Sequence, residues 1–305
     1  MKRDTRHIPV LLDEVLRTLN PHPGQTIVDC TLGLGGHSAA ILECIKPDGR
    51  LIAIDFDPAN IELARQRLTT IGGHFDLFHN NFAALPTVLA QAGVNTVDAI
   101  LADLGVASPQ IDDPARGFSY RRPGPLDMRM DPTRGQPASG LIARLPEDEL
   151  AQALLEFGDE TDAPQIARLI VERRKIAPIA TTEALMSIVC EAREFTLKRA
   201  AGAKLHPAAR TFQALRILVN RELANLDRLL AVIPDCLTPG GTAAIISFHS
   251  GEDRRVKFAF RHGQGAGIYE SISPDPIIAT EVEQKLNPRS RSAKLRWARR
   301  NVVSS

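Results

Sequence analysis

The feature that most constrains the fold of this chain is a glycine-rich turn at residues 29–37, which reads Asp-Cys-Thr-Leu-Gly-Leu-Gly-Gly-His. It follows an apolar run typical of a strand, and a second acidic turn begins at Asp55, 22 residues after Gly33. Glycines let the backbone approach a ligand where a Cβ would collide, and an acidic residue that ends the next strand can accept hydrogen bonds from ribose hydroxyls. The two turns therefore predict a βαβ unit that binds an adenosine-containing cofactor.

The details of the turn favour S-adenosylmethionine over NAD. A dinucleotide fingerprint has a third small residue at the place of Ser38, and its helix N-terminus faces a pyrophosphate. Here the third glycine comes early and His37 opens the helix. Asp29 would repel phosphate, whereas it suits the amino group of a methionine moiety. Because such turns are a weak signal, a glycine-rich turn that merely packs tightly stays open as an alternative.

The composition indicates an ordinary soluble protein with one large or two medium domains, since the chain has 305 residues, 44% hydrophobic and 24% charged. No apolar run approaches the ~20 residues of a membrane span, and the N-terminal region lacks a signal-peptide core, so we expect a cytoplasmic protein with no membrane partner. The cysteines at 30, 44, 190 and 236 lack CxxC spacing. The sequence therefore predicts no metal site and no disulfide framework.

The net charge is only +1, but the basic residues are segregated along the chain. Residues 168–216 hold ten Lys or Arg against four acids, and residues 284–305 hold seven basic residues and no acid. This pattern modestly favours a polyanionic partner such as nucleic acid. Solvated helix faces and a basic tail are the alternative. The stretch around Trp297 is expected to form the last sheet strands, with Lys294, Arg296 and Arg299 outward.

Five short apolar runs read as buried strands, and helical patterns separate the first four. The runs are residues 27–30, 51–54, 75–78, 97–101 and 242–248. Such alternation predicts an α/β fold with a parallel, doubly wound sheet.

About 140 residues separate the fourth run from the fifth, which is far more than a crossover needs. Amphipathic patterns around Leu150, Ile166 and Leu185 predict three short helices with a small core of their own, and a longer pattern from Phe212 to Leu230 is expected to form the crossover helix. The predicted sheet domain comprises residues 1–111 and 207–305. A small, mainly helical subdomain is inserted at residues 112–206.

The fourth run ends in a second informative segment, Asp103-Leu-Gly-Val-Ala-Ser-Pro-Gln110. Ligands of open α/β sheets bind outside the carboxyl ends of the strands, so Asp103, Asp55 and Gly35 should converge on one crevice. An Asp before a proline-bearing loop also suits methylation of an exocyclic amine, whose alignment with the methyl group does most of the catalytic work. Pro109 as a simple loop stiffener is an equal alternative, and Asp103 is better supported as a cofactor contact than as a base.

Several segments together resemble one bacterial enzyme family, the 16S rRNA (cytosine-N4)-methyltransferases, also called the MraW or RsmH family. The most specific are Gly124-Pro-Leu-Asp-Met-Arg-Met-Asp-Pro-Thr-Arg-Gly135 and Ser247-Phe-His-Ser250. Residues 7–14, 29–37, 53–58, 103–110, 116–119 and 206–222 extend the resemblance over nearly the whole chain. It departs at Gly251, where the family usually has a large apolar residue, at Ala107, where serine is common, and in a short region at 263–288.

The resemblance implies a class I (Rossmann-like) methyltransferase fold with S-adenosylmethionine as methyl donor. The implied acceptor is a specific cytidine of 16S rRNA, in the decoding region of the small ribosomal subunit, and a homodimer is left open. Carried over position by position, the cofactor contacts are Gly35, Gly36, His37, Asp55, Phe82, Asp103 and Gln110. The face of Phe82 can cover adenine, and His37 can donate to the methionine carboxylate.

Candidates for substrate contacts come from the residues themselves. In the arginine-rich stretch 116–134, Arg121, Arg122 and Arg129 are candidates for phosphate or base contacts, with internal Arg–Asp pairing as the alternative. The cytosine must leave its stack, and Phe248 or His249 can receive it. Core packing of Phe248 and a satisfied loop position for His249 are equally open. A nucleic-acid-binding protein that keeps the cofactor fold without catalysis, such as an assembly factor, and an NAD-linked oxidoreductase remain as alternative functions.

Overall fold

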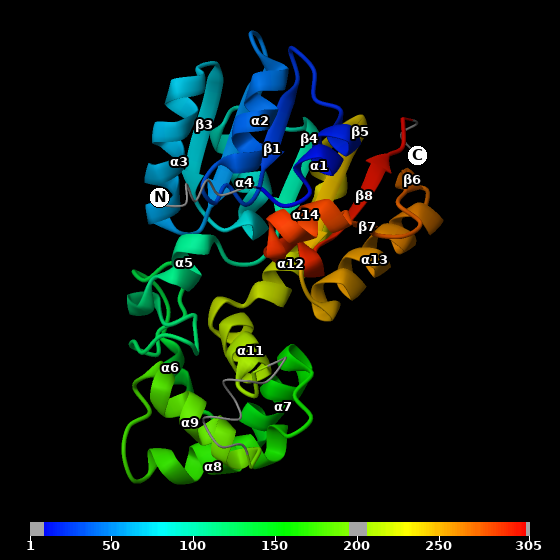
Figure 1. Cartoon of the computed structure of the whole chain (residues 1–305). Helices are drawn as coiled ribbons and strands as arrows, with labels where there is room; N and C mark the ends of the chain where they lie inside the picture. Colours follow the sequence, from blue (N-terminus) through cyan, green and yellow to red (C-terminus); the bar gives the residue numbers. More distant parts are fainter. Residues whose placement is uncertain (1–8, 195–205, 303–305) are drawn as a thin grey trace. The chain divides into compact units, whose positions relative to one another are not determined.

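The computed structural model describes residues 9–194 and 206–302. The chain divides into two compact units, one formed by Met1–Gly105 with Leu223–Ser305 and the other by Val106–Glu222. Figure 1 shows the sheet of the first unit and the helices of the second. The first residues of the 7–14 segment and the part of the basic stretch at 195–205 lie outside the described residues.

The first unit is built on one mixed sheet with strand order β3-β2-β1-β4-β5-β8-β6, and β7 pairs with β8. The first five strands in this order are parallel, whereas β8 is antiparallel to β5, β6 and β7. The strands are β1 (Thr26–Asp29), β2 (Arg50–Asp55), β3 (His74–His79), β4 (Val97–Asp103), β5 (Leu237–Ser247), β6 (Tyr269–Ile272), β7 (Ile277–Ile278) and β8 (Lys294–Arg300). The predicted doubly wound α/β sheet is confirmed.

Helices cover both faces of this sheet because its buried strands are apolar on both sides. In β2, Leu51 and Ala53 join one hydrophobic cluster, while Ile52 and Ile54 join the other. The first cluster includes side chains of α1 (Leu12–Leu19), α2 (Gly36–Ile45) and α3 (Pro58–Ile71), and the second those of α4 (Leu85–Gln91), α12 (Glu222–Cys236) and α13 (Ser250–Gly265). The unit is completed by η1 (Phe82–Ala84), α14 (Glu281–Leu286) and η3 (Pro288–Ser292).

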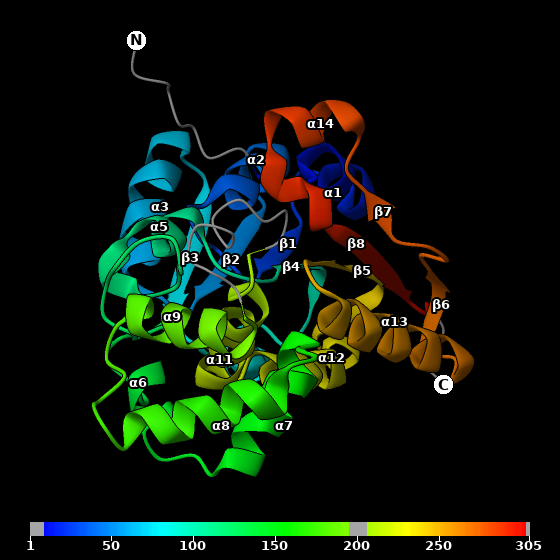
Figure 2. The same ribbon diagram turned by 60° about the horizontal axis from the view of Figure 1, so that its bottom comes forward.

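The second unit is helical and has its own core, as the three amphipathic patterns predicted. Its helices are α5 (Ser108–Asp112), η2 (Pro114–Arg116), α6 (Ala138–Ile142), α7 (Glu147–Gly158), α8 (Ala163–Arg174), α9 (Thr182–Ala192) and α11 (Ala209–Asn220). Leu150, Ile166 and Leu185 are fully buried in one cluster. Figure 2 shows α7, α8, α9 and α11 side by side. The N-cap of α9 is Thr181, whose hydroxyl accepts the N–H of Ala184.

The expected crossover helix from Phe212 to Leu230 is two helices, which shifts the boundary between the units. The chain turns at Arg221, whose φ of 51° is left-handed, so α11 ends before α12 begins. Phe212 on α11 belongs to the core of the second unit, whereas Leu226 on α12 packs on the sheet. The helical unit therefore spans 106–222 rather than 112–206. An arginine gives no local signal for a left-handed turn, since it takes this conformation rarely.

The expectation for Arg296 is also corrected. Its side chain is buried, and Nε donates to Asp253 Oδ1 at 2.7 Å. Lys294 Nζ lies 3.3 Å from the same carboxylate, while Arg299 is exposed as predicted. The reason is topological, because β8 lies between β5 and β6 inside the sheet and α13 packs against it. Among the described residues, no helix is both long and apolar enough to cross a membrane.

Candidate functional site

The carboxyl ends of β1, β2 and β4 carry Asp29, Asp55 and Asp103, and these strands are neighbours in the sheet. Parallel strands end at one edge, so all three carboxylates belong to the same edge, where open α/β sheets bind ligands. Backbone hydrogen bonds fix the chain after β1, since Cys30 N–H donates to Leu101 and Leu32 N–H donates to Ile54, both at 2.8 Å. Asp103, Asp55 and the glycine turn therefore lie at one edge of the sheet, as expected, while the ligand crevice between them stays a prediction.

The glycines of the turn are required by backbone conformation and by close packing. Gly35, the N-cap of α2, has a φ of 72°, and a Cβ there would lie 3.2 Å from the Cβ of Ala64 on α3. A Cβ on Gly36 would lie 2.5 Å from Cγ of Pro9. The first N–H groups of any helix have no partner within it, so the start of α2 can hold an anionic group such as a carboxylate.

Asp55 joins the two turns that the sequence singled out. Its Oδ2 accepts the N–H of Gly33 at 2.7 Å, and its Oδ1 accepts the N–H of Asp57 at 2.7 Å. The amide of Asn60 donates to Oδ1 at 3.3 Å and to Oδ2 at 3.4 Å. Burial is the main cause that raises the pKa of Asp55 to about 6. The two contacts from Asn60 are the longest of these hydrogen bonds, so they are the ones that a donor from a ligand can most readily replace.

His37 lies between the N-terminal segment and Asp103. Its ring is buried, and Nε2 lies 2.9 Å from the carbonyl oxygen of Val10, so this nitrogen carries the proton. The other nitrogen, Nδ1, lies 3.6 Å from Asp103 Oδ2. The ring nitrogens thus face Val10 and Asp103 rather than a ligand carboxylate. Both ring nitrogens therefore have neighbours within the protein, so these contacts do not support the expected donation from the His37 side chain. The backbone N–H groups at the start of α2 are the alternative donors for a ligand carboxylate.

Asp103 presents a buried oxygen that nothing in the described chain satisfies. Its Oδ1 has no hydrogen-bond partner among residues 9–194 and 206–302. Burial raises the pKa of Asp103 to about 6, and the nearby Asp29 and Glu252 act in the same direction while His37 opposes them. Buried carboxylate oxygens are normally paired, so this atom is suited to a donor or a cation supplied by a ligand.

Asp29 is buried beneath the glycine turn and holds it by hydrogen bonds at both of its ends. Its buried carboxylate accepts the hydroxyl of Ser38 at 2.7 Å and the N–H of Thr31 at 3.0 Å. Burial raises the pKa of Asp29. The hydroxyl of Thr31 in turn lies 2.6 Å from the N–H of Asp103, so one hydrogen-bonded chain links the ends of β1 and β4. Ser38 and Thr31 are site-building residues that the sequence patterns missed, because a lone hydroxyl in a turn carries no distinctive signal.

Phe82 and Gln110 occupy different units. Phe82 opens η1 after β3 and is half-buried against the cluster that contains α4 and α12. Gln110 lies on α5 in the second unit, where it is buried and its Oε1 accepts the N–H of Ala107 at 2.8 Å. Gln110 therefore caps its own short helix. Contacts of either residue with the cofactor stay predictions.

Phe248 and His249 lie between β5 and α13, and the buried Glu252 forms hydrogen bonds with the backbone of both residues. Glu252 Oε2 accepts the N–H of Phe248 at 2.8 Å and that of His249 at 3.4 Å. Glu252 Oε1 lies 3.2 Å from Nε2 of the His249 ring. Gly251 leaves room for this ring, since a Cβ there would lie 3.2 Å from His249 Nδ1. The sequence analysis proposed Phe248 and His249 as receivers of the base but missed Glu252. Its position at N3 of a helix is typical of a capping carboxylate and could have indicated this role.

The three candidate arginines of the second unit differ in their surroundings. Arg129 forms two hydrogen bonds with Asp127, from Nε at 2.8 Å and from Nη2 at 2.7 Å, which is the internal pairing considered as an alternative. Arg122 is exposed and pairs with Asp112 at 3.5 Å. Arg121 is exposed and lies over the ring of Tyr120, with 5.8 Å between its Cζ and the ring centroid. Arg121 and Arg122 are thus better placed for a partner than Arg129.

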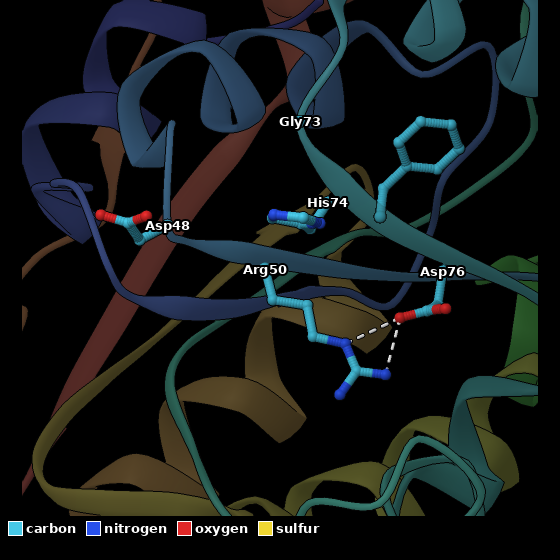
Figure 3. Close-up of a pocket in the computed structure, with 6 residues that line it drawn as sticks. Asp48, Arg50, Gly73, His74 and Asp76 are labelled. Carbon is cyan, nitrogen blue, oxygen red and sulfur yellow. Dashed lines mark hydrogen bonds and ion pairs between the residues drawn. The ribbon is translucent and has the colours of Figure 1, made fainter.

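A separate pocket lies at the opposite ends of the strands. It is lined by Asp48, Arg50, Gly73, His74, Phe75 and Asp76 (Figure 3). Arg50 starts β2, and its guanidinium points to Asp76, with Nε and Nη2 at 2.8 and 2.7 Å from Oδ2. Since the residues of the candidate site follow the carboxyl ends of the strands, this pocket is not part of it.

Comparisons with known proteins agree over nearly the whole chain. The model of the MraW methylase family matches residues 4–301. The ribosomal RNA small subunit methyltransferase H of Nitratidesulfovibrio vulgaris is 47% identical, with 97% of this chain and 86% of that protein covered. The protein of the same description from Geotalea uraniireducens is 44% identical, with 97% and 98% covered. Among solved structures, the N-methyltransferase NodS from Bradyrhizobium japonicum aligns at 10% identity and a TM-score of 0.42, with 95% of this chain and 94% of NodS covered.

Proposed function

Because this chain belongs to the MraW methylase family, we propose that it methylates N4 of one specific cytidine of 16S rRNA, in the decoding region of the small ribosomal subunit. The chain is an S-adenosylmethionine-dependent rRNA methyltransferase with a class I (Rossmann-like) fold. The full-length match to relatives described as rRNA small subunit methyltransferases supports the proposed substrate. The expected place of action is the cytoplasm, where the assembled small subunit is the partner.

The residues at the sheet edge fit S-adenosylmethionine. The cofactor carries cationic groups and ribose hydroxyls, and Asp103 offers a buried oxygen with no partner in the described chain. Asp55, at the end of β2, is proposed to bind the ribose, and the first N–H groups of α2, at Gly36 and His37, are proposed to bind the methionine carboxylate. The proposed contact set is Gly35, Gly36, His37, Asp55, Phe82, Asp103 and Gln110.

The bound cofactor supplies an electrophilic methyl group on a sulfonium sulfur. N4 of cytosine is a poor nucleophile because its lone pair is delocalised into the ring, so the protein must orient this nitrogen and accept its hydrogen bonds. Methyl transfer would form the N–C bond as the S–C bond breaks with its electron pair left on sulfur. N4 would then be cationic and would release one proton to solvent water. Asp103 is the proposed catalytic group, since an anionic oxygen near the reacting nitrogen stabilises the positive charge as it develops.

The target cytidine must be extruded from its stack to meet the methyl group. Phe248 is proposed to stack on the extruded base, and His249, with its ring beside Glu252, is proposed to meet a polar edge of that base. Arg121 and Arg122 are proposed to contact the rRNA backbone, since both are exposed. The pairing of Arg129 with Asp127 supports a structural role for Arg129 instead.

The decisive experiment is transfer of tritiated methyl from S-adenosylmethionine to isolated small subunits, to protein-free 16S rRNA and to DNA, followed by nucleoside analysis. The expected product is N4-methylcytidine, with the assembled subunit as the preferred substrate. The same label at another atom of the rRNA would overturn the proposed specificity. No label on any substrate, in a preparation that binds cofactor, would instead favour a non-catalytic assembly factor.

A further inference from the structure

The outer face of α13 combines exposed arginines with an exposed aromatic ring. Arg254, Phe258 and Arg261 follow each other at spacings of four and three residues, so they lie on one face of the helix. All three are exposed, and Phe258 is 73% exposed. The ring of Phe258 is parallel to that of His262, with 6.1 Å between centroids and 7° between planes. The opposite face of α13 carries the buried Val256 and Phe260.

The two acidic residues of α13 are used on its inner side. Glu252 is buried and accepts the N–H of Phe248. Asp253 receives hydrogen bonds from Arg296 and Lys294 of β8, which lower its pKa. Within residues 9–194 and 206–302, neither Arg254 nor Arg261 forms an ion pair. The outer face of α13 is therefore cationic, without carboxylates of its own helix to neutralise it.

The chemistry of this face selects a polyanion over an apolar partner. Single-stranded nucleic acid is bound by aromatic rings on which bases stack and by arginines that contact the backbone. The exposed apolar residues of α14, Val282 and Leu286, have acidic neighbours. Their helix carries Glu281 and Glu283. Among the exposed large apolar residues of the described chain, Phe258 is the one aromatic residue, and it lies between two arginines at helical spacing.

The position of this face along α13 relates it to the candidate site. His249 is the N-cap of α13, and Phe258 follows it by nine residues. At 1.5 Å per residue, this separation is ~13 Å along the helix axis. That is too long for one nucleotide, so an RNA strand that reaches both His249 and Phe258 must extend over several nucleotides.

From these observations, we infer that the outer face of α13, formed by Arg254, Phe258 and Arg261, binds an unpaired stretch of rRNA a few nucleotides from the methylated cytidine. The inference rests on the proposed function in one respect, namely that RNA is the substrate. It adds a second contact surface, distinct from the base-receiving residues at the start of α13.

The test compares a triple variant, R254A/F258A/R261A, with a matched control on α3. The control is L63A/R67A, which removes an exposed apolar residue and an exposed arginine four residues apart on another helix. The equilibrium Kd for small subunits and for protein-free 16S rRNA is measured by filter binding with S-adenosylhomocysteine present, so no turnover is needed. Kd for S-adenosylhomocysteine and far-UV circular dichroism show that the fold and the cofactor site are retained.

The expected result is a Kd for both RNA substrates at least ~10-fold weaker in the triple variant, with the control unchanged. The slope of log K against log salt should flatten by about 1.4, about 0.7 for each lost phosphate contact with an unpaired strand. F258W should retain binding, whereas F258A alone should weaken it, since tryptophan preserves stacking. Equal Kd values for the triple variant and wild type would overturn the inference. So would weaker binding to subunits alone, which would identify a ribosomal protein as the partner.

These outcomes are separable from the failure of the proposed function. A wild-type protein that binds rRNA through α13 but forms no N4-methylcytidine would contradict the proposed reaction and support the binding surface. A wild-type protein that forms N4-methylcytidine while the triple variant binds as tightly would retain the reaction and overturn the surface.

Discussion

The backbone N–H of Gly33 donates a 2.7 Å hydrogen bond to the carboxylate of Asp55. The turn after β1 is thereby fastened to the turn after β2, across two neighbouring strands. A residue proposed to bind the ribose is thus also a structural element of the glycine turn. Changes at Asp55 should affect cofactor binding and the local fold together, and the two effects can be measured apart.

Asp55→Asn is expected to weaken cofactor binding by about 10-fold or more. An Asn amide cannot accept at both of its ends, so the N–H of Gly33 or of Asp57 loses its acceptor, at a cost of about 1–3 kcal/mol. Calorimetric titration with S-adenosylhomocysteine measures the affinity, and urea unfolding measures the stability. The control is Asp76→Asn, since Asp76 pairs with Arg50 at the opposite ends of the strands. Equal losses in the two variants would contradict a role for Asp55 at the cofactor.

Cofactor affinity should rise with pH through the range in which Asp55 and Asp103 ionise. Burial raises the pKa of each to about 6. Donors on the cofactor favour the ionised carboxylates, so binding should release protons near pH 6, tighten by about 10-fold per carboxylate from pH 5 to 7, and level off above. In the absence of cofactor, the free energy of unfolding depends on pH in the opposite direction. The folded state holds more protons than the unfolded chain between about pH 4 and 6, so this contribution to stability falls as pH rises through that window.

Titrations with S-adenosylhomocysteine from pH 5 to 8, in buffers of different ionisation enthalpy, measure both the affinity and the proton release. Asp103→Asn should remove about half of the pH dependence. An affinity that is flat or that falls from pH 5 to 7 would contradict the role of these carboxylates.

Strand positions in this chain could be predicted from sequence because buried strands such as Leu51–Ile54 are continuous apolar runs bounded by turns. The end of the inserted unit could not be predicted in the same way. α11 and α12 share one apolar periodicity, and only the left-handed backbone at Arg221 separates them. Arg296 shows a second limit, since its burial depends on the pairing of β8 between β5 and β6 and on the carboxylate of Asp253.

Gly35→Ala is expected to lower both stability and cofactor affinity. The left-handed conformation costs an alanine about 1–2 kcal/mol, and the new Cβ would lie 3.2 Å from the Cβ of Ala64, which pushes α2 and α3 apart. Gly93→Ala is the matched control, because its φ of 73° carries the same strain with no atom within 4 Å of the added Cβ. Both variants should be destabilised in urea unfolding, but only Gly35→Ala should lose affinity for S-adenosylhomocysteine. Unchanged affinity would remove this glycine from the cofactor site.

The arginines of the second unit should separate into two classes. R121A/R122A is expected to raise KM for small subunits several-fold without a change in cofactor affinity, because both side chains are exposed. Arg129→Ala is expected to destabilise the helical unit by about 1–3 kcal/mol, because it removes the two side-chain hydrogen bonds to Asp127 and leaves only the one from the backbone N–H of residue 129. Steady-state methylation and urea unfolding distinguish the two effects. If Arg129→Ala raised KM at full stability, the structural role assigned to Arg129 would be wrong.

The site could be predicted from sequence where a residue has a local signature, as at Asp55 after β2 and the glycines before α2. The site could not be predicted where it depends on contacts between segments that are far apart in the sequence. The interaction of His37 with Val10 and the enclosure of Asp29 by Ser38 are decided by packing, which no spacing reveals. Glu252 is intermediate, since its position at the start of α13 is visible in the sequence but its approach to the His249 ring is not.

Replacement of His249 by Ala should lower turnover by about 10- to 100-fold, and it should change cofactor affinity much less. The ring faces Glu252 at 3.2 Å rather than the glycine turn, so its loss should affect the placement of the base.

Glu252→Gln keeps a carbonyl oxygen for the N–H of Phe248 but removes the negative charge beside the ring. We therefore expect Glu252→Gln to lower kcat, leave KM for the cofactor nearly unchanged and alter the pH profile of kcat, which a purely structural cap would not do. Single-turnover methyl transfer to small subunits measures the chemical step directly. If His249→Ala retained wild-type turnover, His249 would have no part in the mechanism, and an unaltered pH profile in Glu252→Gln would reduce Glu252 to a helix cap.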